Sequence, residues 1–157
     1  MECKMTKEIL LTQGKVAIVD DEDYELVSQW TWSANHSKKR WYAIRKQLPR
    51  HMHTLIMGSP KGLDVDHKDR NGLNNVRSNL RLATRSQNMM NHGKQSNNVS
   101  GYKGVIWDKE REKWRAQTKT NGKFIVIGRY KTAEEAARAY DKFVRTIFGD
   151  FAWINFP

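Results

Sequence analysis

Short apolar runs alternate with polar, glycine-containing turns in the N-terminal half of this 157-residue chain. The runs cover residues 9–11, 16–19, 30–34 and 40–46. They predict two pairs of short strands, the first of which turns at Gln13-Gly14. Residues 20–29 open with acidic side chains, which favour a helix N-terminus, and predict a short helix. Pro49 suits a first helical turn and Gly58 a helix end, so we expect a second helix between them.

Two further apolar runs enclose a long polar loop. Residues 63–67 and 80–84 predict the two strands of a hairpin, and residues 84–91 predict the beginning of a helix. Residues 92–100 are polar and lack apolar periodicity. We therefore expect them to be a linker between two domains.

The pattern is clearest beyond this linker. Strand-like runs cover residues 102–107, 113–119 and 123–128. Asn121-Gly122 predicts a tight hairpin turn because both residues tolerate positive φ, and Thr132 with Glu135 forms a capping box before a helix expected to end at Gly149. The apolar stripe of that helix comprises Ala136, Tyr140, Phe143, Val144 and Ile147. These features predict a three-stranded antiparallel sheet covered by one helix, and we assign the whole chain to the α+β class.

The charge distribution points to a polyanionic partner. The formal net charge is +11, and residues 38–94 hold thirteen lysines and arginines against three aspartates. Residues 20–25, in contrast, hold five acids and no base. A concentrated positive segment is the electrostatic footprint of nucleic-acid binding. A solvated basic surface, an anionic membrane or an acidic protein partner also fits the charge alone.

Composition narrows these alternatives. Hydrophobic residues make up 38% of the chain and charged residues 29%, which is typical of a soluble globular protein. No apolar run approaches the roughly 20 residues that span a bilayer, and the N-terminus lacks a signal-peptide core. The single cysteine, Cys3, excludes an intramolecular disulfide and a paired-cysteine zinc knuckle. We expect a cytoplasmic protein with no membrane partner and no zinc site.

The predicted hairpin gathers side chains suited to a metal and a base. These are Asp66 and His67 at the end of its first strand, Asn79 before its second strand, and Asn88 about one turn into the following helix. Carboxylate and amide oxygens suit Mg²⁺, which keeps positions for water and phosphate. A neighbouring imidazole can take a proton from an attacking water, so metal and base together meet the needs of phosphodiester hydrolysis. Loop chemistry is the alternative, because asparagine favours turns.

The stretch "HTLIMGSPKGLDVDHKDRNGLNNVRSNLRLATRSQNMMN", within residues 52–91, resembles the HNH endonucleases, particularly the small phage and intron-associated homing group. The resemblance implies a ββα-metal fold that uses a divalent metal, most simply Mg²⁺ with Mn²⁺ as an alternative. The roles that it implies are Asp66 as first metal ligand, His67 as general base, Asn79 as the residue that orients the loop and the histidine, and Asn88 as second metal ligand.

Three neighbouring side chains have two interpretations each. Arg81 and Arg85 are either phosphate clamps or solvated surface arginines. His53 stands where such proteins often carry a histidine, but it is followed by Thr54 and also fits a structural histidine on a helix. The region before the motif resembles the lead-in of this HNH group more loosely, and we expect it to scaffold the site.

Residues 100–157 resemble the APETALA/ERF DNA-binding domain through "YKGV", "EEAARAYD" and the closing "NFP". That family reads the DNA major groove with the exposed face of its sheet. Alternation turns Trp114, Ala116 and Thr118 towards the helix and their neighbours outward. The candidate DNA contacts are Lys103, Arg115, Gln117, Lys119, Phe124, Val126 and Arg129. Trp107 fits either a base contact or the core.

This outward face departs from that of the plant members of the family. Phe124 and Val126 stand where plant members carry arginine and tryptophan, so we do not expect the plant GC-rich target. An apolar pair on the reading face would suit thymine methyl groups.

The combined interpretation is a site-directed nuclease. We expect an HNH endonuclease domain at 1–91, with its ββα-metal core at about 63–91, a linker at 92–100 and a DNA-binding domain at 101–157. The expected function is metal-dependent, homing-type DNA cleavage, most simply nicking, by a monomer or weak dimer with duplex DNA as partner and no small-molecule substrate. If phage-encoded, the protein would act inside the host cell. The alternatives are a DNA-binding regulator with a vestigial nuclease domain and, less well supported, an RNA-binding or structural protein.

Overall fold

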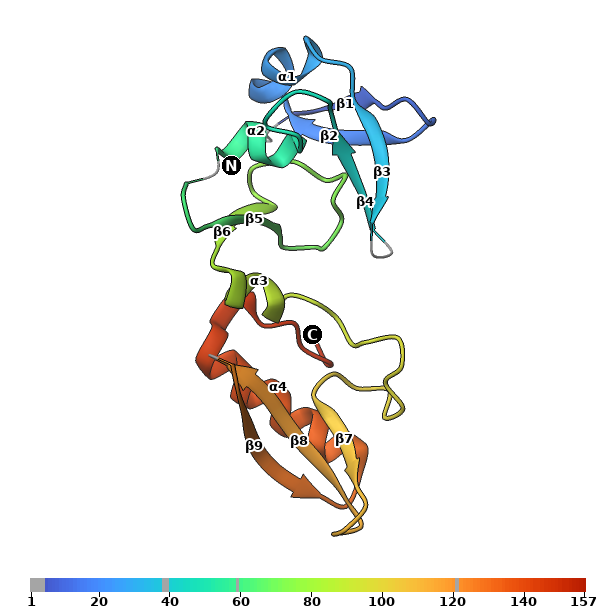
Figure 1. Cartoon of the computed structure of the whole chain (residues 1–157), viewed down its shortest axis with the longest axis vertical. Helices are drawn as coiled ribbons and strands as arrows, with labels where there is room; N and C mark the ends of the chain where they lie inside the picture. Colours follow the sequence, from blue (N-terminus) through green and yellow to red (C-terminus); the bar gives the residue numbers. More distant parts are fainter. Residues whose placement is uncertain (1–4, 38–39, 59, 121) are drawn as a thin grey trace. The chain divides into compact units, whose positions relative to one another are not determined.

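The computed structural model describes residues 5–37, 40–58, 60–120 and 122–157, and the chain divides into two compact units, Met1–Arg85 and Ser86–Pro157 (Figure 1). Both units combine small antiparallel sheets with a few helices, which confirms the mixture of α and β structure expected from the sequence. None of the helices in the described ranges is long and apolar enough to cross a membrane.

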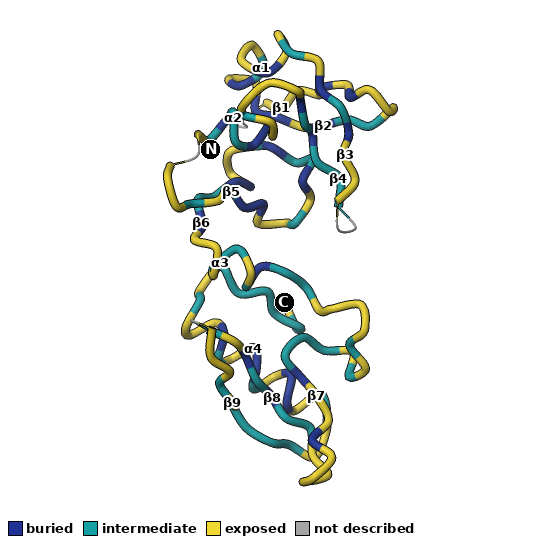
Figure 2. Tube along the Cα trace, in the orientation of Figure 1, coloured by how far each residue is buried: buried dark blue, intermediate teal, exposed yellow. Residues whose placement is uncertain are grey.

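The described part of the first unit contains three two-stranded antiparallel sheets and two short helices. Its elements are β1 (Thr6–Leu10), β2 (Val16–Asp20), α1 (Asp21–Ser28), β3 (Ser33–Ser37), β4 (Arg40–Ile44), α2 (Met52–Met57), β5 (Asp64–His67) and β6 (Leu80–Ala83). The sheets pair β1 with β2, β3 with β4, and β5 with β6. Side chains from the strands, from both helices and from the segment before β3 share one apolar core, in which Val19, Trp32 and Met52 are buried. Figure 2 shows the buried positions along the chain in dark blue.

The third strand begins later than the sequence predicts. It starts at Ser33 instead of residue 30. The reason lies in Trp32, which is buried and donates a 2.9 Å hydrogen bond from its indole Nε1 to the carbonyl of Val27 in α1. The segment from Trp30 to Trp32 therefore packs against the C-terminal end of α1, and β3 begins only after it.

Helix α2 begins at Met52, so the prediction that it starts at Pro49 is wrong. The Pro49 carbonyl accepts a 3.0 Å hydrogen bond from Nε of Arg45. The backbone N–H of Arg45 donates to the Arg50 carbonyl at 2.8 Å, and His51 forms a bridge with the end of β4. These contacts fold the segment back on β4 as a turn, and the helix begins only after it.

The second unit contains one three-stranded antiparallel sheet and the long helix that covers it, as the sequence predicts. Helix α3 (Arg85–Met90) begins at the last residue of the first unit. The remaining elements are β7 (Val105–Asp108), β8 (Lys113–Thr120), β9 (Lys123–Tyr130), α4 (Ala133–Phe148) and the 3-10 helix η1 (Gly149–Phe151). The strand order is β7-β8-β9. The predicted Asn121-Gly122 turn falls partly on residue 121, which lies outside the described residues.

Helix α4 confirms the capping box and most of its predicted stripe. The Thr132 hydroxyl accepts from the Glu135 backbone N–H at 3.1 Å, and the Glu135 carboxylate accepts from the Thr132 N–H at 3.2 Å. Tyr140 is buried against the sheet. Ile147, in contrast, is 45% exposed, so the last member of the predicted stripe is not buried. Phe148 packs on this core at the end of the helix, because one residue further turns the side chain by about 100°.

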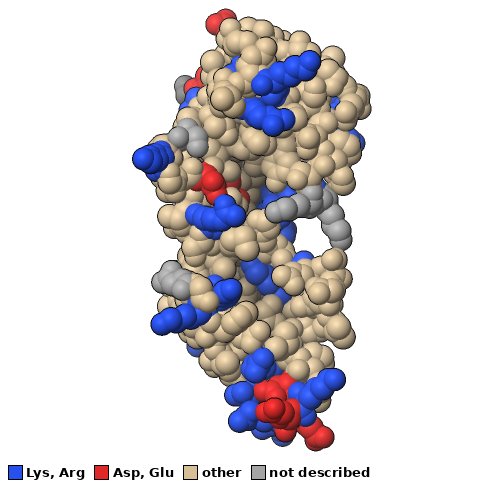
Figure 3. Space-filling view, in the orientation of Figure 1, with Lys and Arg blue, Asp and Glu red and all other residues tan. Residues whose placement is uncertain are grey.

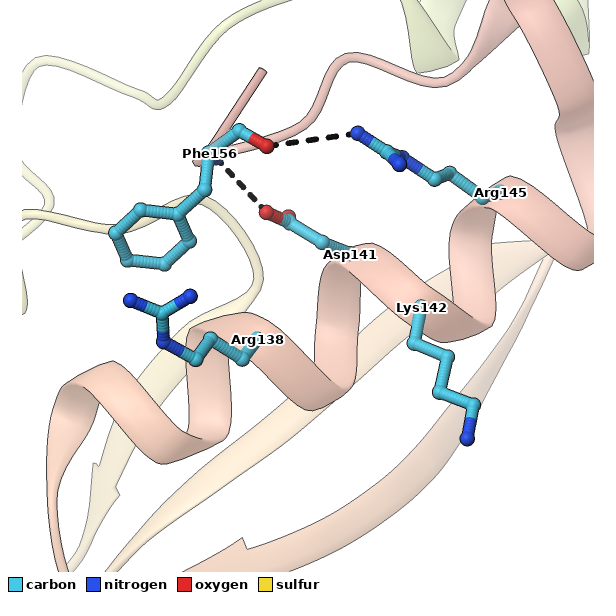
Figure 4. A pocket seen from close by; sticks show the side chains of 5 residues that line it. All are labelled: Arg138, Asp141, Lys142, Arg145 and Phe156. Atoms are coloured by element: carbon cyan, nitrogen blue, oxygen red, sulfur yellow. Dashed lines mark hydrogen bonds between the residues drawn. The ribbon is translucent and has the colours of Figure 1, made fainter.

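The C-terminal tail is fastened to α4 by one buried carboxylate. Asp141 accepts a 2.9 Å hydrogen bond from the backbone N–H of Phe156 (Figure 4). It also accepts 2.9 Å hydrogen bonds from the backbone N–H and from the side chain of Asn155. The guanidinium of Arg138 lies 4.5 Å from the centre of the Phe156 ring. The Asn155 side chain in turn accepts from the backbone N–H of Lys103 at 2.8 Å. The closing "NFP" therefore has a structural role in this unit.

The segment that follows α3 is also tied to the second unit. The Met90 carbonyl accepts from the Lys103 Nζ at 2.6 Å and from the Trp153 N–H at 3.1 Å. The Lys94 Nζ donates to the Gly101 carbonyl at 2.9 Å. Because of these bonds the structural division falls before Ser86, ahead of the linker predicted at 92–100. The proposed domain limits, 1–91 and 101–157, remain predictions.

Candidate functional site

The β5–β6 hairpin carries an acid and an imidazole on consecutive residues at the end of β5. Asp66 pairs with Arg81 across the hairpin, and His67 pairs with Leu80. The Asp66 carboxylate is 4% exposed and accepts from Nε and Nη2 of Arg81 at 2.9 and 2.8 Å. A guanidinium that donates two hydrogen bonds to one carboxylate is a strong ion pair. Arg81, a candidate phosphate clamp in the sequence, thus contacts the candidate metal ligand in this structure.

The imidazole of His67 is buried and bonded to a residue that the sequence analysis missed. Its Nε2 lies 3.2 Å from Oδ1 of Asn75, which is 0% exposed. The only signal in the sequence is the doublet Asn74-Asn75, and either member of it could equally have been a turn residue.

Asn79 holds the turn that follows the histidine. Its Oδ1 accepts from the backbone N–H of Asp69 at 3.0 Å. Its Nδ2 donates to Oδ1 of Asp69 at 2.9 Å and to the Asn74 carbonyl at 2.8 Å. Asn79 also accepts at its backbone carbonyl from the N–H of Lys68, the residue after His67. The structure therefore brings Asn79 and the His67 turn together.

The loop that carries Asn75 is fastened to the N-terminal hairpin. The Ile18 N–H donates to the Leu73 carbonyl at 2.8 Å, and the Asn75 N–H donates to the Ile18 carbonyl at 2.7 Å. Two residues further, the Arg77 N–H donates to Asp20 at 2.7 Å. The N-terminal β-strands thus fix the loop backbone on both sides of Asn75.

Histidine rings gather around His67. The His53 ring lies 4.8 Å from the His67 ring in an edge-on arrangement and 5.0 Å from the His51 ring in a stacked one. Burial, followed by the neighbouring rings of His67 and His51, lowers the pKa of His53 to about 3. Burial also lowers the pKa of His67, although the hydrogen bond to Asn75 and the carboxylates of Asp69 and Asp66 act in the opposite direction. Both rings are therefore neutral at pH 7, as a general base requires.

The other two residues assigned to cleavage, Arg85 and Asn88, both lie in α3. Arg85 is the first residue of α3 and is exposed, and Asn88 is half-buried in the same helix. Asn88 belongs to the second unit, whereas Asp66 and His67 belong to the first. The assignment of Asn88 as a metal ligand therefore rests on the sequence motif.

A second acidic group in the first unit is a structural ion-pair network. The carboxylates of Asp20, Glu22 and Asp23 lie close enough together to hold a metal ion. Arg77, however, contacts all three through its backbone N–H or its guanidinium, at 2.7 Å from Asp20, 3.6 Å from Glu22 and 2.7 Å from Asp23. The guanidinium of Arg77 therefore supplies the positive charge that a metal ion would otherwise supply to these carboxylates.

The outward face of the second sheet carries the candidate DNA contacts, and one acid holds two of them. Asp108 lies 2.8 Å from Nε of Arg129 and 3.7 Å from Nη1 of Arg115. The hydrogen bond from Arg129 lowers the pKa of the Asp108 carboxyl. Charged side chains of both signs crowd around the β7–β8 turn (Figure 3). Both arginines are therefore partly neutralised where the sequence suggested free guanidinium groups.

The rest of this face is apolar and polar. Phe124 is 67% exposed beneath the Lys119 ammonium, which lies 5.4 Å from its ring centre. Val126 is exposed and pairs with Gln117 across the sheet. Lys103 differs from the expectation, because its ammonium donates to the Met90 carbonyl. The predicted alternation is thus confirmed for β8 and β9, whereas the groups on the face are less cationic than the sequence alone indicates.

Trp107 takes an intermediate position. Its ring lies 5.1 Å from that of Trp114 in an edge-on arrangement, and the residue is nevertheless partly exposed. It therefore packs at the margin of the sheet and keeps part of its ring in contact with solvent.

The comparisons with known proteins agree with the two units. Residues 48–90 match the HNH endonuclease family, and residues 100–150 match the AP2 domain. An "uncharacterized HNH endonuclease" of Acanthamoeba polyphaga mimivirus is 35% identical over 150 residues, which cover 91% of this chain and 76% of the relative. "Protein 3.8" of Escherichia phage T7 is 47% identical over 64 residues, which cover 41% of this chain and 53% of that protein. No solved structure matches significantly. With its Asp-His hairpin and a match that extends over most of its length, the chain belongs to the HNH endonucleases and combines a nuclease domain with an AP2-type DNA-binding domain.

Proposed function

We propose that this protein is a metal-dependent, homing-type DNA endonuclease that nicks duplex DNA at a site selected by its AP2-type domain. The observation that carries the proposal is the placement of His67, a neutral buried imidazole next to the Asp66 carboxylate at the end of β5. A base and an anionic oxygen on adjacent residues are the groups that phosphodiester hydrolysis needs.

The donor chemistry fits a hard divalent cation. Asp66 supplies a carboxylate oxygen in a buried site, where it forms an ion pair with Arg81. Oxygen donors favour Mg²⁺, with Mn²⁺ as the alternative. Asp66 and, by the family motif, Asn88 would hold the ion in a ββα-metal arrangement. When bound, the metal would polarise the phosphate and stabilise the leaving oxygen.

The protein residues have separate tasks in this proposal. His67 takes the proton from the attacking water, and Asn79 keeps the turn after His67 in place through three side-chain hydrogen bonds. Arg85 contacts a phosphate near the cut. Arg81, which forms an ion pair with Asp66, would contact the phosphate once DNA is bound.

The sheet of the second unit selects the site. The proposed contacts are Lys103, Arg115, Gln117, Lys119, Phe124, Val126 and Arg129. Gln117 suits an adenine edge, and the apolar pair suits thymine methyl groups, whereas Lys119 suits phosphate. A reader tethered to a nuclease raises the local concentration of the active site at selected sequences. Because one active site per chain cuts one strand at a time, we propose that a monomer or weak dimer nicks the DNA. We propose that it acts in the cytoplasm, or inside the host cell if phage-encoded.

Plasmid relaxation tests the proposal directly. Supercoiled DNA that carries candidate target sequence is incubated with the wild type in Mg²⁺, in Mn²⁺ and in EDTA. We expect metal-dependent conversion to open circles, and a loss of about 10²–10⁴-fold for His67→Ala, the usual contribution of a general base. His36→Ala, which alters an exposed histidine of the same unit, is the matched control and should cut normally. Tight DNA binding without cleavage in either metal would instead indicate a DNA-binding regulator.

A further inference from the structure

Asn75 occupies an unusual position for a loop asparagine. It is 0% exposed, and its Oδ1 lies 3.2 Å from Nε2 of His67. Its Nδ2 is buried and has no hydrogen-bond partner in the described part of the chain. A buried donor without a partner costs free energy, and a turn asparagine would normally expose or satisfy both ends of its amide. The position is therefore poorly explained by packing alone.

The surrounding backbone determines where this amide points. The Asn75 N–H donates to the Ile18 carbonyl of β2 at 2.7 Å, and the neighbouring Leu73 carbonyl accepts from the Ile18 N–H at 2.8 Å. The Arg77 N–H then donates to Asp20 at 2.7 Å. The loop is thus held to the N-terminal hairpin immediately before and after Asn75, so the side chain has little freedom to leave the histidine.

A carbonyl oxygen can only accept a hydrogen bond, and this restricts the neutral imidazole. In the orientation that the structure gives this amide, with Oδ1 facing the ring, Nε2 of His67 carries the ring proton and donates the hydrogen bond. The remaining lone pair of the neutral ring is then on Nδ1. Only that nitrogen can receive a proton from water, because Nε2 is already protonated.

We propose that Asn75 is a positioning residue that fixes His67 in the Nε2-protonated tautomer and so presents Nδ1 as the basic atom of the site. The role in cleavage rests on the proposed nuclease function, but the tautomer does not. The N-terminal strand β2 would therefore contribute indirectly to cleavage, because it holds the backbone that positions the Asn75 side chain against His67. Partners that orient an active imidazole act through the nitrogen that does not react, which is the geometry seen here.

The tautomer can be measured without cleavage. ¹⁵N-labelled, full-length protein in EDTA at pH 7.5 is studied by NMR, in which protonated and unprotonated ring nitrogens of His67 have well-separated shifts. We expect the wild type to be protonated at Nε2. We expect Asn75→Leu, which removes the acceptor at similar volume, to show a mixture of tautomers, and Asn75→Asp, which keeps the acceptor, to retain Nε2 protonation. Asn74→Leu is the matched control, since that side chain contacts Asp69 and not the imidazole.

Single-turnover nicking in Mg²⁺ completes the test. Asn75→Leu should lower the rate by about 10–100-fold, the usual effect of removing a residue that orients a ligand or base, and Asn75→Asp should restore most of it. A wild-type His67 protonated at Nδ1, or an Asn75→Leu protein that stays fully protonated at Nε2, would overturn the proposal. If Asn75→Leu does not fold, the wild-type and Asn75→Asp spectra still decide. Absence of nicking in the wild type with the expected tautomer would reject the nuclease proposal and leave the positioning role intact.

Discussion

Replacing Asn79 by alanine should destabilise the first unit far more than replacing its neighbour Asn74. The Asn79 amide makes three hydrogen bonds of 2.8–3.0 Å, to the backbone and carboxylate of Asp69 and to the Asn74 carbonyl. The Asn74 side chain makes one, from Nδ2 to the Asp69 carboxylate at 2.8 Å. At about 1 kcal/mol for each bond, Asn79→Ala should cost about 3 kcal/mol and Asn74→Ala about 1 kcal/mol.

Urea titration of the full-length protein followed by ¹H–¹⁵N NMR provides the assay. Amide signals of buried first-unit residues, such as Val19 and Ala83, report the unfolding of that unit. Signals of Val105 and Ala116 report the second unit and should have unchanged midpoints in both variants. Nicking by Asn79→Ala should fall together with stability, because the turn after His67 loosens.

The ranking of the two variants is what the structure predicts and the sequence does not. Equal losses of unfolding free energy for Asn79→Ala and Asn74→Ala would refute the bond-by-bond reasoning. A loss below 1 kcal/mol for Asn79→Ala would refute it as well, since three satisfied hydrogen bonds in a partly buried site cannot then contribute as assumed.

Three further outcomes are expected. The pKa of His53 is about 3 in the folded protein and about 6.5 in the unfolded chain. As the pH is lowered from 6.5 to 3, the unfolded chain therefore takes up a proton that the folded protein does not. The free energy of unfolding in EDTA should then fall by up to about 1.4 kcal/mol for each pH unit of acidification. His53→Gln should reduce the dependence of unfolding free energy on pH in this range, and an unchanged dependence would contradict the assignment to His53. Asp108→Asn should release Arg129 and tighten duplex binding at low salt. The slope of log K against log salt concentration, measured by fluorescence anisotropy, should steepen by about 0.9 for each added phosphate contact. An unchanged slope would show that Asp108 does not restrain the arginine. Gly104→Ala should cost about 3 kcal/mol in urea titration of the second unit, because φ is +76° and the added Cβ would overlap the Tyr140 ring. A cost below 1 kcal/mol would mean that the ring moves aside freely.

Local rules were sufficient wherever neighbours in the sequence determine the structure. Thr132 and Glu135 of the capping box are three positions apart in the chain, and both of its hydrogen bonds form. The alternation along β8 likewise turns Ala116 inward, because successive side chains of a strand point to opposite faces. The same rules failed at Pro49, where contacts with Arg45 turn the chain before the helix begins.

The candidate site shows where such rules end. The motif "VDHKDRN" identified Asp66 and His67 and placed them at the end of a strand, where the structure has them. The motif could not identify Asn75 as the partner of the imidazole, because the loop between β5 and β6 holds four asparagines, at positions 71, 74, 75 and 79. That choice depends on a backbone contact with Ile18, 57 positions away from Asn75 in the chain.

The sequence by itself determined the family, the two functional modules and the types of side chain available to each, because these depend on spacing and periodicity along the chain. Only the tertiary structure decided which groups meet. It pairs Arg81 with Asp66 and Arg129 with Asp108. Two arginines that the sequence suggested as DNA contacts are therefore engaged in ion pairs within the protein. Periodicity fixes the face on which a side chain lies, whereas its partner is fixed by strand register and packing between distant segments.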